Sequence, residues 1–123
     1  MATSYAQLYR QLIQMAATNH IRLALATYSM AVNDRSDPAL VEFYQGGYPL
    51  APWQIQANLV HSIIVQKIAV EHPEVCFVDT HPHLDGEHDK YIDLVHFAPA
   101  GDQQLAETFF AALRPLLEDL SRL

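Results

Sequence analysis

Cysteine, glycine and basic residues are scarce in this sequence of 123 residues. Cys76 is the only cysteine, so an intrachain disulfide is excluded, and its place in an apolar run indicates a buried thiol. Lys and Arg number seven against 14 Asp and Glu. The resulting formal charge of −7 argues against nucleic acid as a partner, because binding to phosphates needs clustered basic side chains.

Long apolar runs are absent as well. None approaches the roughly 20 residues that a transmembrane helix needs, and the first residues, Met1 to Ser4, lack the features of a secretory signal. We therefore expect a cytoplasmic protein without a membrane partner. Half of the residues are apolar, which is enough for one packed domain and argues against disorder.

Segments with helical periodicity alternate with short apolar runs along the chain. The periodic segments predict helices over residues 5–19, 38–44, 52–72 and 99–113. Two short apolar runs, Ile21–Thr27 and Val75–Val78, have no helical period and predict buried strands. Because helices separate them, the two strands should pair in parallel with right-handed crossovers. Two strands are too few for a complete doubly wound sheet, so the pattern predicts part of one.

Local signals set the expected helix boundaries. Ser4 and Gln7 have the spacing of a capping box, which predicts Ser4 as the N-cap of the first helix. Asp37 and Pro38 predict the N-cap and first position of the short helix. Pro115 should end or kink the last helix, and Leu116, Leu117 and Leu120 should continue a last turn or two. The predicted buried stripe of the long central helix consists of Trp53, Ala57, Val60, Ile64 and Ile68.

One short segment combines an acid and a base. Asp93-Leu-Val-His96 places a carboxylate and an imidazole three residues apart, after the second strand and just before the last helix. A carboxylate that accepts a hydrogen bond from Nδ1 fixes the tautomer of the imidazole, and Nε2 can then deprotonate a nucleophile. We therefore expect Asp93 and His96 to lie together beyond the carboxyl end of the second strand, where open α/β sheets place their sites.

The segment as a whole resembles the last sequence block of the SGNH/GDSL family of ester hydrolases. That block consists of Asp-x-x-His, an apolar residue, a short Pro/Gly turn and a closing amphipathic helix. The corresponding residues here are Asp93 and His96, then Phe97, the turn that ends at Gly101, and the helical stretch Leu105–Phe109.

The resemblance extends upstream in order and covers nearly the whole chain. The matching stretches are Tyr5–Asn19, Ile21–Tyr28, the helix around Asn58, and Val75–Asp79. It implies an α/β fold, namely a partial three-layer flavodoxin-like sandwich with a short parallel sheet and flanking helices. It also implies that Asp93 and His96 are the acid and the base of a Ser-His-Asp triad.

The family's blocks that carry the nucleophile and the oxyanion donors have no counterpart in this sequence. No serine lies in a Gly-Asp-Ser turn or a Gly-x-Ser-x-Gly elbow, and Ser29, which follows the first strand, is the least unsuitable. Asn33-Asp34 resembles the family's Gly-x-Asn-Asp block only superficially, since Ala31 stands in the Gly position. One oxyanion donor is worth ~10²–10³ in rate. The sequence therefore predicts little hydrolysis by this chain alone.

Two other groups of side chains are candidates for binding. His81, His83 and His88 lie among carboxylates in the segment Thr80–Lys90, but their spacing fits no closed metal motif. We therefore predict a solvated polar loop, with no metal and no cofactor. The second group is aromatic and falls in the region that forms a variable lid over the acyl pocket in the family, with ordinary core packing as the alternative. Its members are Tyr28, Tyr44, Tyr48 and Trp53.

Three functions fit these observations. The first is a truncated SGNH/GDSL-type ester hydrolase-like protein, inactive alone, that retains Asp93 and His96. The second is one subunit of a split esterase, in which a separate chain supplies the serine block. The third is a small self-associating binding module with a metal or ligand at the His-rich loop. The substrate is not readable from the sequence, because the family builds its acyl pocket from parts that are absent or variable here.

The resemblance also predicts an assembly. The strand Ile21–Thr27 is internal in the family's sheet, so its outer edge would be open here. An open edge of an apolar strand is a template for pairing. Because twofold dimers are the commonest closed assemblies, we expect a homodimer in which the first strands meet or the same faces pack together.

Overall fold

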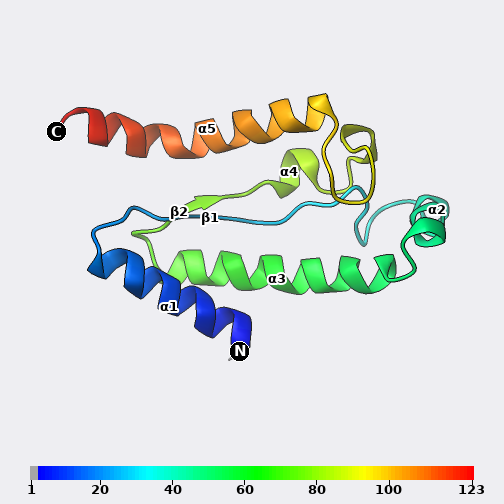
Figure 1. The fold of residues 1–123 in the computed structure, drawn as a ribbon, viewed down its shortest axis with the longest axis horizontal. Coiled ribbons are helices and arrows are strands. Elements are labelled where there is room, and N and C mark those ends of the chain that lie inside the picture. Colours follow the sequence, from blue (N-terminus) through cyan, green and yellow to red (C-terminus); the bar gives the residue numbers. More distant parts are fainter. Residues whose placement is uncertain (1–2) are drawn as a thin grey trace.

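The computed structural model describes residues 3–123 as a mostly helical α/β chain with one short parallel sheet (Figure 1). Its elements are α1 (Ser4–Thr18), β1 (Ala24–Ala26), α2 (Pro38–Gly47), α3 (Ala51–Glu71), β2 (Cys76–Val78), α4 (His81–Leu84), the 3₁₀ turn η1 (His88–Lys90) and α5 (Pro99–Ser121). The α/β class predicted from the sequence is confirmed.

The two strands pair in parallel, as predicted. Ala24 lies opposite Cys76 and Ala26 opposite Val78. Both strands are shorter than the apolar runs that predicted them. The N–H of Ile21 donates to the carbonyl of Ala16 at 2.8 Å, at the end of α1, so the start of the first run belongs to the helix–strand connection.

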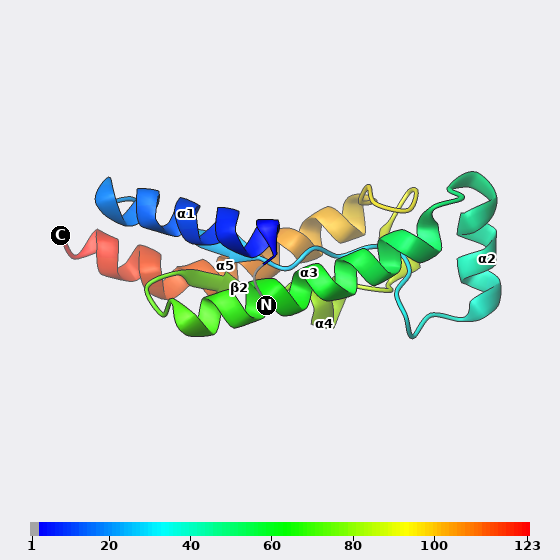
Figure 2. The same cartoon turned by 90° about the horizontal axis from the view of Figure 1, so that it is seen from below.

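Helices lie on both sides of the strand pair. α5 runs along one side, and α3 together with α1 runs along the other (Figure 1). The view from below shows α1 beside β1, and α4 on the far side of the strands (Figure 2). The main core consists of Ala6, Ile13, Leu25, Ile64, Val65, Ile68 and Val75. A second buried cluster, nearer α2, consists of Met30, Val32, Ala51, Ile55 and Leu94.

The N-cap of the first helix was predicted one residue too late. Thr3, not Ser4, is the N-cap, and its side chain accepts a hydrogen bond from the N–H of Ala6 at 3.2 Å. Both residues carry the hydroxyl that a cap requires, so the sequence does not distinguish them. The cap of α2 is as predicted, with Asp37 accepting from the N–H of Ala39 at 2.8 Å and Pro38 in the first turn.

The central helix α3 buries only part of the predicted stripe. Ile64 and Ile68 are buried, as predicted. Trp53 is 67% exposed, and Ala57 and Val60 are also exposed. Asn58 and Ser62 are buried instead. Apolar residues occur on nearly all sides of α3, so hydrophobicity alone does not select its inner face. The polar side chains face inward because Asp85 and His81 lie there as hydrogen-bond partners.

The last helix extends beyond its predicted bound at residue 113. α5 continues without a break through Pro115 to Ser121, so the turns predicted after Pro115 belong to the same helix. Pro115 is exposed, and half-buried Leu113 and Leu116 on either side of it keep the helix packed. The segment predicted as a polar loop, residues 80–90, contains α4 and η1.

Among the described residues, no helix has both the length and the apolar character needed to cross a bilayer.

Candidate functional site

The predicted acid and base lie on a tight loop between η1 and α5. A β-bridge between Tyr91 and Phe97 closes the base of this loop, and the two rings pack with centroids 4.8 Å apart. Leu94, at the middle of the loop, is buried, and its carbonyl accepts from the N–H of Ala31 at 2.9 Å. The loop is therefore held at both ends and fixed to the segment that follows β1.

Asp93 accepts three hydrogen bonds within this loop. Its Oδ1 accepts from the N–H of Val95 at 2.9 Å and from the N–H of His96 at 2.8 Å. Its Oδ2 lies 2.7 Å from Nδ1 of His96. The structure thus contains the carboxylate–Nδ1 contact that the spacing predicts. The catalytic role of the pair stays a prediction.

The hydrogen bonds favour the ionised form of Asp93. The backbone N–H groups of His96 and Val95, and then the imidazole, lower the pKa of Asp93 to about 2. The Asp93 side chain is 29% exposed, whereas that of His96 is 72% exposed. Nε2 of His96 has no hydrogen-bond partner within residues 3–123. A carboxylate on Nδ1 and an open Nε2 are what the base half of a hydrolytic triad requires.

Two tyrosines from other segments lie within the electrostatic influence of Asp93. Burial, and then the charge of Asp93, raise the pKa of Tyr28, which follows β1, and of Tyr44 in α2. Tyr28, Tyr48 and Trp53 are exposed, whereas Tyr44 packs against the second buried cluster. Core packing therefore accounts for Tyr44 but not for the other three aromatics.

No serine in the described part of the chain is hydrogen-bonded to His96. Ser29 is buried, and its Oγ lies 2.7 Å from Oγ1 of Thr80. Thr80 in turn donates its backbone N–H to Oγ1 of Thr27 at 2.8 Å. The Ser29 hydroxyl thus belongs to a buried cluster that joins the segments leaving β1 and β2.

A different serine and histidine do meet, and sequence reasoning missed them. Oγ of Ser62 lies 3.0 Å from Nε2 of His81, but the same nitrogen lies 2.8 Å from the carbonyl oxygen of Tyr28. Because a carbonyl only accepts, Nε2 carries the proton and cannot act as a base toward Ser62. The only signal in the sequence is weak: Asn58 and Ser62 are polar residues four positions apart on an otherwise apolar helix.

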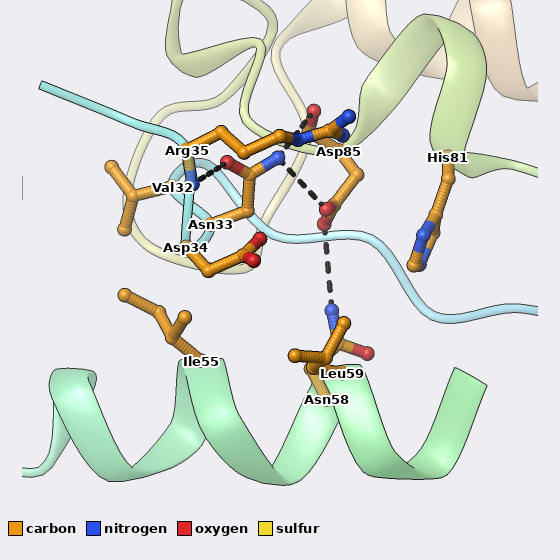
Figure 3. Close-up of a pocket in the computed structure, with 9 residues that line it drawn as sticks. All are labelled: Val32, Asn33, Asp34, Arg35, Ile55, Asn58, Leu59, His81 and Asp85. Atoms are coloured by element: carbon orange, nitrogen blue, oxygen red, sulfur yellow. Dashed lines mark hydrogen bonds between the residues drawn. The ribbon is translucent and has the colours of Figure 1, made fainter. Parts of the chain in front are cut away.

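A hollow of about 260 Å³ lies between α3 and the loop that follows β1 (Figure 3). Asp85 points into it, and its carboxylate is already hydrogen-bonded. Oδ1 accepts from the N–H of Met30 at 3.0 Å and lies 3.4 Å from Nδ2 of Asn58. Oδ2 accepts from Nδ2 of Asn33 at 3.0 Å. These bonds connect three segments, and neither residue of the Asp93–His96 pair lines the hollow.

Asn33 is engaged through both ends of its amide. Nδ2 donates to the carbonyl and the carboxylate of Asp85, and Oδ1 accepts from the N–H of Arg35 at 2.9 Å. Gly86, at φ +82°, lies so close that an added Cβ would be 2.6 Å from Nδ2 of Asn33. The amide has no free hydrogen for an oxyanion, which agrees with the interpretation of Asn33-Asp34 as a superficial likeness.

The three histidines of the His-rich segment do not converge. His81 is directed toward Tyr28 and Ser62, while His83 and His88 are exposed. Within residues 3–123, no three His, Cys, Asp or Glu side chains form a group suited to hold a metal ion.

A scan against protein-family models and searches of curated proteins and of solved structures found no match for this chain. The functional interpretation therefore depends on the geometry of Asp93 and His96 and on the motif in which they occur.

Proposed function

We propose that this chain is the acid–base half of an SGNH/GDSL-type ester hydrolase and is inactive alone. The observation that carries the proposal is the 2.7 Å contact between Oδ2 of Asp93 and Nδ1 of His96. It directs the lone pair of a neutral imidazole to Nε2, which has no partner within residues 3–123. The assignment to the SGNH/GDSL type is supported by the motif that runs from Asp93 to Phe109.

The architecture supports this proposal. Parallel strands with α5 on one side and α1 and α3 on the other are expected for part of a three-layer flavodoxin-like sandwich (Figure 1). In such a sandwich the site lies beyond the carboxyl ends of the strands. The Asp93–His96 loop follows β2 and is tied through Leu94 to the segment that leaves β1.

Weak hydrolysis is expected because acyl transfer needs a base, a nucleophile and an oxyanion donor. The described residues supply the base but neither of the other two. General base catalysis contributes ~10²–10⁴ in rate, but only toward a nucleophile in hydrogen-bond reach. No serine in the described residues is bonded to His96, and the Asn33 amide is occupied. Without an oxyanion donor, a further ~10²–10³ is lost.

Hydrolysis of p-nitrophenyl acetate by the purified chain tests this proposal. We expect slow, burst-free release of p-nitrophenol at the level of exposed imidazoles. His96→Ala should lower it by a small amount, and by no more than His83→Ala, a control at another exposed histidine. A burst of product, or an activity abolished both by His96→Ala and by one Ser→Ala change, would show a relocated nucleophile and refute the proposal.

A second candidate is the split esterase, in which a separate chain brings the serine. It is favoured by the 72% exposure of the His96 side chain, which leaves room for a nucleophile from outside. A tagged form of the chain would be incubated with extract from its source cells and recovered. Ester hydrolysis that appears in the recovered complex, and is absent when the bait carries His96→Ala, would support this candidate. Capture without such activity would count against it.

A further inference from the structure

The side of the molecule next to β1 is uncovered. In the described residues, β1 has β2 as its sole strand neighbour. The carbonyl of Leu23 and the N–H of Thr27 bond to β2. Alternate residues of a strand direct their peptide groups to opposite edges, so those of Ala24 and Ala26 face the outer edge. Such an edge is a template for another strand.

Two helices carry apolar stripes at heptad spacing. On α1, the stripe is between 43 and 64% exposed and consists of Tyr5, Leu8, Leu12 and Met15. On α5, Phe110, Leu117 and Leu120 are between 45 and 61% exposed, and half-buried Leu113 completes the spacing. Alternating steps of three and four residues place each set on one flank of its helix, as in helices that pack on another helix.

Both stripes lie on the β1 side. α1 runs beside β1 (Figure 2), and its buried residues Ala6, Ile13 and Ala16 are on a different flank from its stripe. On α5, the flank with Gln104 and Thr108 borders a hollow with Asp79 and His83, which follow β2. The stripe of α5 is on the other flank and so points toward the β1 side. We call the two stripes together with the outer edge of β1 the β1 face.

The distribution of charge favours a like chain on this face. The net charge of −7 makes two copies repel each other on average. No acidic residue precedes Asp34, so α1 and β1 contain none of the 14. Arg10, the sole charged residue of α1, is paired with Glu71 at 2.8 Å. The stripe of α5 is also uncharged. Acidic repulsion is therefore smallest where these surfaces meet.

The large exposed surface of the single chain also favours a second copy on this face. A compact monomer of 13.9 kDa exposes about 6,700 Å². This chain exposes 8060 Å², about 1,400 Å² more. A stable protein–protein interface takes ~800 Å² from each partner. The excess is enough for one such interface.

We propose that a second copy of this chain binds the β1 face around a twofold axis perpendicular to the sheet. The outer edges of the two β1 strands then pair antiparallel and give a four-stranded sheet in the order β2-β1-β1-β2. The same axis brings α1 against α1 on one side of the sheet and α5 against α5 on the other, so each stripe packs on its own copy. The inference goes beyond the proposed function and does not depend on the role of His96.

Sedimentation velocity and light scattering on the full chain test the dimer. We expect a mass of twice 13.9 kDa at micromolar concentration. Leu8→Glu in α1 and Phe110→Glu in α5 replace side chains about 60% exposed in the single chain, so each should still fold, as circular dichroism would check. Each change enters a twofold interface twice, and we expect at least a roughly hundredfold rise in the dimer Kd. Phe43→Glu in α2, at a residue 75% exposed and off the β1 face, is the matched control and should leave the dimer intact.

Oxidative cross-linking tests the arrangement within the dimer. Leu12→Cys and Leu117→Cys should each give disulfide-linked dimers, whereas Phe43→Cys and the wild type, with its native Cys76, should not. A wild-type monomer at micromolar concentration would overturn the proposal. So would a dimer that survives both Leu8→Glu and Phe110→Glu, or one that Phe43→Glu disrupts.

Discussion

Asp93 is oriented chiefly by backbone N–H groups of its own loop. Two of its three hydrogen bonds come from the N–H groups of Val95 and His96, so the carboxylate keeps its position even without the imidazole. Its partner His96 and another hydrogen-bonded histidine, His81, carry the proton on different ring nitrogens. In His81, Nε2 donates its proton to the carbonyl of Tyr28. In both histidines, an acceptor supplied by the surrounding fold selects the tautomer.

The lowered pKa of Asp93 predicts a dependence of stability on pH. Its pKa is about 2 in the folded chain, against roughly 3.9 in an unfolded one. Ionised Asp93 therefore stabilises the fold above pH ~4, and this contribution is lost as the pH falls toward ~2. Asp93→Asn removes the titration, so its urea midpoint should fall less than that of the wild type over this range.

Asp102→Asn, at an exposed carboxyl in the first turn of α5, serves as the control for that measurement. Its acid profile should follow that of the wild type more closely than the Asp93→Asn profile does. Parallel profiles for the wild type and Asp93→Asn between pH ~5 and ~2 would mean that Asp93 is not held by the hydrogen bonds described.

At the scale of elements, the start of α5 fixes the loop that carries the pair. Gly101 is buried, and an added Cβ would collide with the carbonyl oxygen of Lys90 and lie 2.8 Å from Cδ1 of Phe97. Phe97 belongs to the closed base of the Asp93–His96 loop, and Lys90 directly precedes that base. The absence of a side chain at Gly101 thus permits the helix to pack against that loop.

Gly101→Ala should therefore destabilise the chain by about 1–3 kcal/mol, the usual cost of overpacking. Gly46→Ala is the matched control, because α2 leaves at least 4 Å free around its added Cβ. It should be neutral or stabilising by up to ~1 kcal/mol. Chemical denaturation of both variants measures the difference. Equal midpoints would show that α5 and the loop are not packed as described.

The elements differ in how far the sequence determines them. Asp37 with Pro38, and Asp93 with His96, are local patterns, and the structure contains the contacts that each predicts. The polar part of the inner face of α3, Asn58 and Ser62, was not predictable, because its burial depends on Asp85 and His81, which are distant in sequence. For the same reason, the meeting of Ser62 with His81 gives no local signal.

At the scale of the whole molecule, the Asp93–His96 loop lies apart from the helices of the β1 face. α1 and the last turns of α5 lie toward one end of the molecule, and the loop before α5 lies toward the other (Figure 1). A dimer through the β1 face would therefore leave His96 open to solvent. The dimer would also occupy the outer edge of β1, which a serine-bearing chain would need in order to extend the sheet. Dimerisation and a split esterase would therefore compete for the same surface.

The tautomer of His96 is the most direct test of the account, because the proposed base exists only if Nδ1 carries the proton. Nitrogen-15 NMR of the histidine side chains at mildly alkaline pH, where imidazole is neutral, distinguishes the two ring nitrogens. Free histidine in water favours the proton on Nε2. We predict the Nδ1–H form for His96 in the wild type and the Nε2–H form in Asp93→Asn, whose amide can donate to Nδ1. A wild-type His96 with its proton on Nε2, as in free histidine, would contradict the account.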